Sequence, residues 1–269
     1  MAKQVAVVTG ANKGIGLAIV QGLCKAGYAG DIILTARNEK LGQETLQKLK
    51  SEGFNNVLFH RLDICDQTSA EGLRKFLDKN YGGLDVLINN AGIAFKVDAT
   101  EPFGEQAEVT MRTNFWGTLW ASKALLPLLR PNARVVNVSS FFSKRALDKC
   151  SPELQAKFRS ADISEEELCG LMGEFVVAAQ NGNHEAKGWP NTAYGATKVT
   201  PNTAYGITKV TLYTAYGTSK VTLNKAYGIT KVGIAVLLVY LTATALSSAG
   251  WRNGAVPYPG ACSGPDAGG

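Results

Sequence analysis

The sequence predicts an α/β protein, a doubly wound parallel sheet of strand order 3-2-1-4-5 with helices on both faces. Three observations predict it: a length of 269 residues, an alternation of short apolar runs with longer amphipathic stretches, and a glycine-rich turn directly after the first run. Apolar residues make up 45% of the chain and charged residues 19%. This composition supplies a sizeable core and excludes a wholly disordered or coiled-coil protein.

Five short runs rich in β-branched residues or leucine are expected to form the strands: Val5–Thr9, Asp31–Thr35, Asn56–His60, Leu84–Ile88 and Arg134–Val138. Between them, apolar residues recur about once per helical turn, as in the sets Ile15, Ile19, Leu23 and Leu41, Thr45, Leu49. This alternation, with short connections, predicts parallel βαβ units. A ligand is then expected at the carboxyl ends of the strands.

From Phe141 to Trp189 the pattern becomes helical and irregular. Ser164 and Glu167 form the signature of a capping box that opens a helix toward Phe175. The segment is interpreted as a surface helical insertion, and a sharper hypothesis gives it one wall of a substrate cleft.

The next segment holds four near-copies of one unit with a period of 11 residues, each with Ala-Tyr-Gly, two further residues and a lysine. The tyrosine and lysine pairs are Tyr194/Lys198, Tyr205/Lys209, Tyr216/Lys220 and Tyr227/Lys231. Common solenoid repeats are longer, so we interpret one copy as part of the domain and three as tandem duplication.

The apolar run Val232–Leu246 is charge-free and shorter than the roughly 20 residues that span a bilayer, so a helix buried against the sheet is expected. The glycine- and proline-rich stretch Ser247–Gly269 is expected to be a disordered tail. The predicted organisation is thus one main α/β domain over 1–200 that includes the insertion 141–189, tandem repeats over 201–231, an apolar helix over 232–246 and a tail over 247–269.

Charge and cysteine content narrow the class of partner. The net charge is +6 and the basic residues are scattered, which suits a phosphate-bearing small molecule better than nucleic acid. Five cysteines without CxxC spacing indicate reduced thiols of a cytoplasmic protein, and with two histidines no metal site is expected. The first strand begins within a few residues of Met1, so no signal peptide is expected.

The segment from Thr9 to Gly16 joins the first strand to the first helix, where glycines let a pyrophosphate approach the N–H groups at a helix N-terminus. Dinucleotide binding is therefore expected there. At the end of the second strand, where NAD sites carry an acid, the sequence has Ala36 and Arg37, and Lys13 lies in the turn. Two cations suit a 2′-phosphate and hence NADP(H), with a solvated loop arginine as the alternative.

Polar residues also follow the later strands: Asp63-Ile64, Asn89-Asn90-Ala91-Gly92 and Ser139-Ser140, with Asn114 in a helix. Together with the glycine turn and Tyr-x-x-x-Lys, this ordered set resembles the short-chain dehydrogenase/reductase family. Within that family, the segment Ile93–Val97, the long separation of Ser140 from Tyr194 and Glu165–Leu168 resemble the monomeric NADPH-dependent carbonyl reductases. The resemblance runs from about residue 4 to 200.

The resemblance implies reduction of a carbonyl compound by hydride from NADPH. Tyr194 would donate the proton, Lys198 would lower the phenol pKa and bind the ribose, Ser140 would hold the carbonyl oxygen, and Asn114 would support the lysine through a water. Phe95, Lys96, Val97 and Gln106 would border the substrate entrance beside Ser140. The implied cofactor-binding residues are Gly10, Asn12, Lys13, Gly14, Ile15, Gly16, Arg37, Asp63, Ile64, Asn90, Ala91, Gly92, Tyr194 and Lys198.

The chain departs from the family after Leu246, where two further strands and a Pro-Gly loop over the nicotinamide are not found. The sheet is therefore expected to stop at five strands, with the fifth as an exposed edge. This departure leaves three functions open: an active reductase of quinones, aldehydes or ketones; an impaired remnant that binds nucleotide at best; and a variant anchored in a membrane by residues 232–249.

Two of the tyrosine and lysine pairs compete for the catalytic role. Tyr194 lies 54 residues after Ser140 and follows Gly188-Trp189-Pro190, as in the carbonyl reductases, but its helix would meet Pro201, which predicts a kink or an early end. Tyr227 runs directly into the apolar stretch, whose packing would favour it, and residues 189–225 would then form a loop. Spacing leads us to expect Tyr194.

Overall fold

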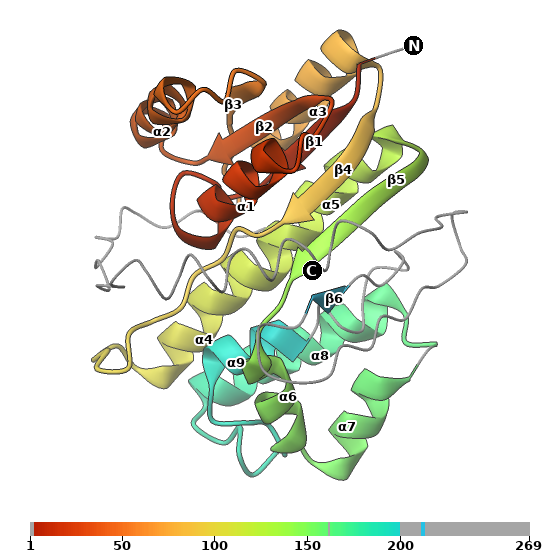
Figure 1. The fold of residues 1–269 in the computed structure, drawn as a ribbon. Helices are drawn as coiled ribbons and strands as arrows, with labels where there is room; N and C mark the ends of the chain where they lie inside the picture. Colours follow the sequence, from red (N-terminus) through yellow and green to blue (C-terminus); the bar gives the residue numbers. More distant parts are fainter. Residues whose placement is uncertain (1–2, 161, 200–210, 213–269) are drawn as a thin grey trace.

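The computed structural model describes residues 3–160, 162–199 and 211–212. Five strands form a parallel sheet of order β3-β2-β1-β4-β5, which confirms the predicted fold class and strand order (Figure 1). They are β1 (Val5–Val8), β2 (Asp31–Ala36), β3 (Val57–Arg61), β4 (Leu84–Asn89) and β5 (Leu129–Val138).

A short sixth strand corrects one expectation. β6 (Thr211–Leu212) pairs in parallel with Asn137 and Val138 of β5. The sheet therefore does not stop at five strands, and β5 is not an exposed edge along these two residues. The remainder of the repeats, the apolar run and the tail lie outside the described residues.

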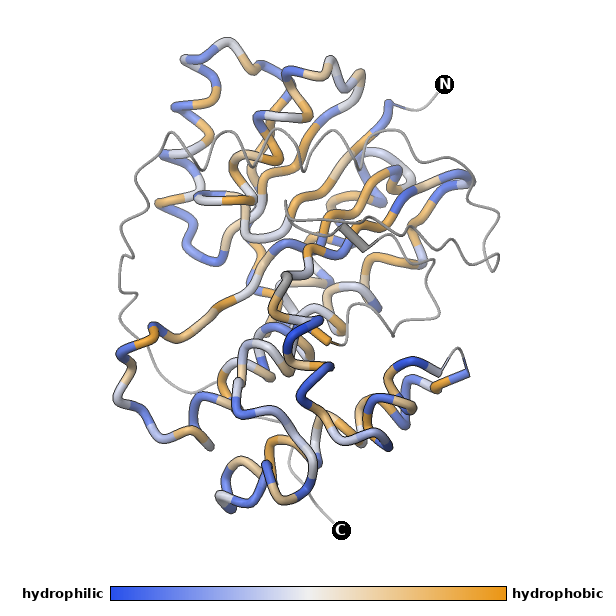
Figure 2. The backbone as a smooth tube through the Cα atoms, turned by 60° about the horizontal axis from the view of Figure 1, so that its bottom comes forward, coloured by the Kyte–Doolittle hydropathy of each residue, from blue (hydrophilic) through white to orange (hydrophobic). Residues whose placement is uncertain are grey.

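Helices cover both faces of the sheet (Figure 1). On one face of the sheet, α1 (Gly14–Lys25) and α2 (Glu39–Ser51) share an apolar core with the strands. On the other face, α3 (Gln67–Tyr81) and α5 (Thr118–Leu125) share a second core with them. Figure 2 shows the strands as mainly hydrophobic stretches of the tube, whereas the helices alternate in hydropathy. Burial on both faces explains why the strands read as continuous apolar runs.

One expected helix face is wrong by a residue. Leu41 is 46% exposed, and the buried side of α2 is formed by Gly42, Leu46 and Leu49. A Cβ at Gly42 would lie 2.0 Å from the ring of Phe59, so the glycine lets α2 pack closely on β3. A glycine therefore occupies the position that the apolar pattern assigned to a leucine.

The segment after β5 folds as the helices α6 (Phe141–Asp148), α7 (Pro152–Arg159), α8 (Glu165–Gln180) and α9 (Ala193–Val199). The capping box is confirmed, since Ser164 Oγ accepts from Glu167 N and the Glu167 carboxylate accepts from Ser164 N. Phe175 of α8 is fully buried with residues of α4 (Phe103–Met111) and with Trp189. One side of α8 thus builds a third core, while Glu165, Glu166 and Val177 on its other side are exposed. The interpretation of the segment as a surface insertion, or as one wall of a substrate cleft, stays a prediction.

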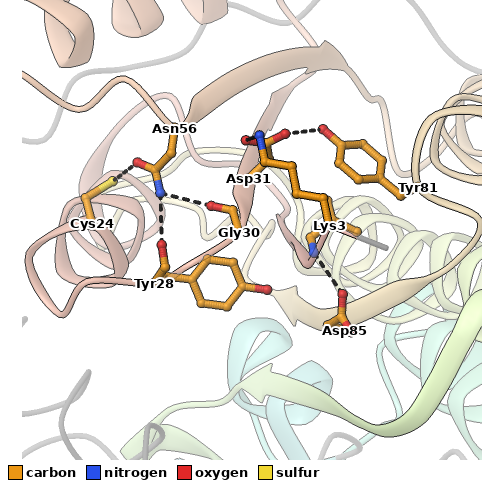
Figure 3. Close-up of polar contacts among 9 residues, drawn as sticks. Lys3, Cys24, Tyr28, Gly30, Asp31, Asn56, Tyr81 and Asp85 are labelled. Atoms are coloured by element: carbon orange, nitrogen blue, oxygen red, sulfur yellow. Dashed lines mark hydrogen bonds and ion pairs between the residues drawn. The ribbon is translucent and has the colours of Figure 1, made fainter. Parts of the chain in front are cut away.

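A polar network joins the strands at the amino ends of the sheet. The Asp31 carboxylate pairs with Lys3 Nζ at 2.6 Å and accepts from Tyr81 Oη at 2.7 Å (Figure 3). Asp85 pairs with Arg130 Nη1 at 2.7 Å. These contacts connect the amino ends of the strands. The polar residues that follow the strands lie at the opposite edge of the sheet.

Candidate active site

The glycine turn between β1 and α1 presents backbone N–H groups. Gly10 and Gly14 have φ values of 62° and 57°, in the left-handed region that glycine adopts most readily. Lys13, the residue before α1, makes no side-chain cap, so the first N–H groups of the helix are not capped by that residue. Gly16 is buried, and a Cβ there would lie 2.5 Å from Asn90 Nδ2 and from Gly10 O. Uncapped N–H groups at a helix start form an anion site.

The segment after β4 is fastened to this turn. Asn90 Nδ2 donates to Thr9 O at 2.9 Å and to Gly10 O at 3.1 Å. In return, Thr9 Oγ1 accepts from the backbone N of Asn90 at 3.0 Å and of Ala91 at 2.9 Å. Sequence reasoning missed the role of Thr9, because its partners Asn90 and Ala91 lie on a different loop, about 80 residues along the chain.

The cations expected at the 2′-phosphate are exposed. Lys13 lies in the glycine turn, and Arg37 follows Ala36, the last residue of β2. Asn12 O accepts from Thr45 Oγ1 at 3.0 Å, which ties the turn to α2, and the neighbouring Ile15 packs against the core. Both cations therefore lie on the loops that follow the carboxyl ends of β1 and β2.

Asp63 and Ile64 follow β3. The Asp63 carboxylate accepts from Cys65 N at 3.0 Å, and the backbone N of Asp63 donates to Ser69 Oγ at 3.0 Å. Ile64 is 6% exposed and packs in the core. The structure thus fixes this loop at the same edge of the sheet as the glycine turn.

Helix α9 brings Tyr194 and Lys198 to Ser140, at the carboxyl end of β5. The Lys198 Nζ lies 5.6 Å from the centroid of the Tyr194 ring, and the Ser140 side chain hydrogen-bonds the Tyr194 hydroxyl group. Burial raises the pKa of Tyr194, and the bond to Ser140 offsets part of that effect. The three residues expected to act on the carbonyl are therefore adjacent.

Lys198 is 7% exposed, and its Nζ donates to Val138 O at 3.1 Å. Burial lowers its pKa to about 8. A Cβ at Gly92 would lie 3.6 Å from this Nζ and 3.1 Å from Asn114 Oδ1, so a side chain at position 92 would crowd Asn114. An amine with this pKa gains or loses its proton near neutral pH, and its charge then affects the pKa of the neighbouring Tyr194 hydroxyl.

Asn114 lies in a π-helical turn, Arg112–Gly117, between α4 and α5. Its Oδ1 accepts from Ile93 N at 2.7 Å, and its Nδ2 donates to Ile93 O at 2.8 Å and to Thr197 Oγ1 at 3.1 Å. π-helical turns occur frequently at functional sites. Sequence reasoning found Asn114 but missed Thr197. The expected support of Lys198 by Asn114 through a water stays a prediction.

The residues expected at the substrate entrance lie on the connection between β4 and α4 and on α4 itself. Phe95 is partly buried, whereas Lys96 and Val97 are exposed. Gln106 Nε2 donates to Glu101 O at 2.8 Å. Phe142, which sequence reasoning missed, is 50% exposed, and its ring lies edge-on to that of Tyr194 with centroids 6.1 Å apart. Their roles toward substrate stay predictions.

The described part of α9 runs to Val199, and Pro201, where a kink or an early end is expected, lies outside the described residues. Tyr205, Tyr216 and Tyr227 and their lysines lie outside the described residues. Over residues 3–160, 162–199 and 211–212, we find no cluster of three His, Cys, Asp or Glu side chains that could hold a metal ion. The same stretches contain no helix long and apolar enough to cross a membrane.

A nucleotide-binding turn and a Ser, Tyr and Lys cluster at one edge of a parallel sheet define a dinucleotide-dependent oxidoreductase. The short chain dehydrogenase family model matches residues 4–158, and the chain belongs to this family. The resemblance drawn from the motifs is thereby confirmed.

Among its relatives, carbonyl reductase [NADPH] 1 of Bos taurus is 60% identical over 195 residues, which cover 72% of this chain and 70% of that protein. The Homo sapiens protein of the same name is 59% identical over the same lengths. Salutaridine reductase from Papaver somniferum superposes with a TM-score of 0.66 at 30% identity, covering 73% of this chain and 78% of that chain.

Proposed function

We propose that this protein reduces carbonyl groups of small molecules, such as quinones, aldehydes and ketones, to alcohols with NADPH. The observation that carries the proposal is the position of Tyr194 between Ser140 and Lys198 at the carboxyl end of β5. The relatives named carbonyl reductase [NADPH] 1 support the same reaction and cofactor.

The residues present fit NADPH. The uncapped start of α1 and the positive φ values of Gly10 and Gly14 suit a pyrophosphate, and the exposed Lys13 and Arg37 suit a 2′-phosphate. We place the nicotinamide ribose beside Tyr194 and Lys198 and the rest of the cofactor along the residues implied by the family pattern. When bound, NADPH supplies a hydride to the carbonyl carbon.

This chain's own residues handle the oxygen and the proton. Ser140 Oγ is placed to hold the substrate oxygen as negative charge develops there. Tyr194 Oη delivers the proton to that oxygen, and the positive charge of protonated Lys198 lowers the phenol pKa that burial raises. Asn114 fixes the segment after β4 against α9.

A remnant that binds nucleotide at best is the second candidate, and the assembled Ser140, Tyr194 and Lys198 cluster favours the reductase over it. The membrane-anchored variant depends on residues 232–249, which lie outside the described residues. Extraction of membranes with carbonate would leave such a variant in the pellet.

We further infer a monomer of the cytoplasm, with the catalytic domain formed by residues 1–200. Free thiols at Cys24, Cys150 and Cys169 suit a reducing compartment. The monomeric state follows the resemblance to the monomeric carbonyl reductases. Light scattering after gel filtration and localisation of a tagged full chain test these two inferences.

The function is tested by oxidation of NADPH with menadione on the purified full chain, alongside a thermal melt. We expect menadione-dependent oxidation that saturates with substrate. A cooperative melt without any turnover would select the remnant instead.

A further inference from the structure

The hydroxyl of Thr197 joins two residues of the candidate site. Thr197 is 0% exposed, and its Oγ1 accepts from Asn114 Nδ2 at 3.1 Å and donates to Tyr194 O at 2.8 Å. The neighbouring residue in the chain is Lys198. One hydroxyl therefore connects the amide of Asn114 to the helix that carries both the proton donor and the cation.

The other groups of Asn114 are already fixed by the backbone of Ile93, at 2.7 and 2.8 Å. Asn114 consequently bridges the segment that follows β4 and α9, and Thr197 is its contact on the α9 side. On the far side of α9, Ser139 Oγ donates to Lys198 O at 3.2 Å. Hydroxyl groups thus hold consecutive residues of α9 to two different parts of the sheet edge.

We propose that Thr197 is a positioning residue for carbonyl reduction, and this inference rests on the proposed function. Its hydrogen bonds set how α9 lies against Asn114 and β5. Because Lys198 Nζ is held by Val138 O of β5 while the Tyr194 ring moves with α9, they also set the distance between Tyr194 Oη and Lys198 Nζ. Displacement of a catalytic group by about 1 Å costs on the order of a hundredfold in rate. The position of Thr197 controls the effect of the lysine charge on the tyrosine pKa, because that effect falls with distance.

The repeated units keep a hydroxyl at the position of Thr197. The residue before the lysine is Thr197, Thr208, Ser219 and Thr230 in the four copies. The residue before that varies in size and chemistry: Ala196, Ile207, Thr218 and Ile229. Across the copies, the hydroxyl is kept while the methyl group and the preceding side chain are not.

The test compares Thr197→Val, which removes the hydroxyl at nearly constant volume, with Thr197→Ser, which keeps it. Thr110→Val is the matched control, because Thr110 is 1% exposed on α4 and its hydroxyl has no hydrogen-bond partner among the residues that the structure describes. Steady-state reduction of menadione by NADPH is measured for each full-length variant across the pH range, together with its thermal melt.

We expect Thr197→Val to lower kcat by about tenfold or more, with a smaller change in the KM for NADPH. The alkaline limb of kcat/KM, where the proton donor ionises, should move to higher pH, because a more distant Lys198 lowers the Tyr194 pKa less. Thr197→Ser should restore both, and Thr110→Val should change neither.

Equal kinetics and an unmoved pH profile in Thr197→Val and Thr110→Val would overturn the positioning role. So would a loss of kcat in Thr197→Val that Thr197→Ser fails to restore. An inactive parent chain, or a Tyr194→Phe variant with full activity, would instead overturn the proposed function, so the two failures are distinguishable.

Discussion

Tyr194 and Lys198 are a half-buried acid and a buried base that the fold places on one face of a short helix. Burial raises the pKa of Tyr194 and lowers that of Lys198. In the proposed reaction, the positive charge of a protonated Lys198 offsets the first effect. The chemistry of the pair therefore depends on its surroundings more than on the residue types, which the repeats supply four times over.

Replacement of Tyr194 by Phe should lower kcat/KM for carbonyl reduction by about 10²- to 10⁴-fold, because proton donation is lost while packing is kept. Matched Tyr→Phe changes at 205, 216 and 227 should leave it unchanged. Steady-state kinetics with one aldehyde checks all four variants. Full activity in Tyr194→Phe combined with loss in Tyr227→Phe would assign the role to the last copy.

Replacement of Lys198 by Met should stabilise the protein without nucleotide at about pH 7 by up to roughly 3 kcal/mol, while it abolishes turnover. The unfolded chain holds the lysine proton up to its ordinary pKa, whereas the folded chain releases it near pH 8. Between these values the unfolded state binds more protons, so stability of the parent rises with pH and the difference disappears above about pH 10. Urea unfolding of the parent and of Lys198→Met, at about pH 7 and above about pH 10, measures the difference in their free energies of unfolding. An equal difference at both pH values would contradict the cost assigned to burial of the charged lysine.

The residues with direct chemistry could be predicted, because their types and order along the chain carry the signal. Thr9 and Thr197 could not, since a threonine acquires a role only through partners that the fold brings from elsewhere in the chain: Asn90 for Thr9 and Asn114 for Thr197. Their hydroxyls are buried and bonded, which no local pattern reveals.

At the scale of elements, apolar runs located all five main strands within a few residues, because both faces of the sheet are buried. β5 begins at Leu129 and not at Arg134, with Pro131 and Asn132 inside it. Asn132 has a φ of 67°, and the pairing of β4 with β5 shifts register between Leu84 and Val86. Proline and asparagine are typical of turns, so the sequence does not predict that the irregular segment before Arg134 belongs to the strand.

Replacement of Gly16 by Ala should weaken NADPH binding more than replacement of Gly14 by Ala. A Cβ at Gly16 would lie 2.5 Å from Asn90 Nδ2 and Gly10 O and force the turn apart, whereas no atom lies within 4 Å of a Cβ at Gly14. The Gly14 change carries only the cost of its positive φ, about 1–2 kcal/mol. Fluorescence titration with NADPH and a thermal melt of each variant separate binding from stability, and equal affinities would contradict the close approach.

At the scale of the whole molecule, the candidate site at the carboxyl ends of the strands is supported by three apolar cores. The strands and their two helix layers form the first two, and α4, α8 and Trp189 form the third around Phe175. The nucleotide residues lie on loops over the first two cores, and Tyr194 and Lys198 lie on α9, which packs on the third. The helices after β5 therefore support the helix that carries Tyr194 and Lys198, which the sequence pattern alone did not indicate.

Replacement of Arg37 by Asp should weaken NADPH binding by about 1.5–3 kcal/mol, the range for a hydrogen bond to a charged group, without equal harm to NADH. Lys50→Asp, at an exposed position in the last turn of α2, makes the same change in net charge away from the glycine turn. Fluorescence titration with both nucleotides checks the preference. Equal affinity of the parent for NADPH and NADH would remove the role of Lys13 and Arg37.

Transfer of label from the cofactor is the most direct measure of carbonyl reduction by this chain. The purified full chain is incubated with NADPH carrying deuterium on C4 of the nicotinamide and with an aromatic aldehyde, and the alcohol is analysed by mass spectrometry. We expect one deuterium on the carbinol carbon of the product when the label is on the transferred face, and little labelled alcohol from Tyr194→Phe. Absence of any labelled alcohol with either C4 epimer, in a protein that melts cooperatively, would contradict the assignment as a carbonyl reductase.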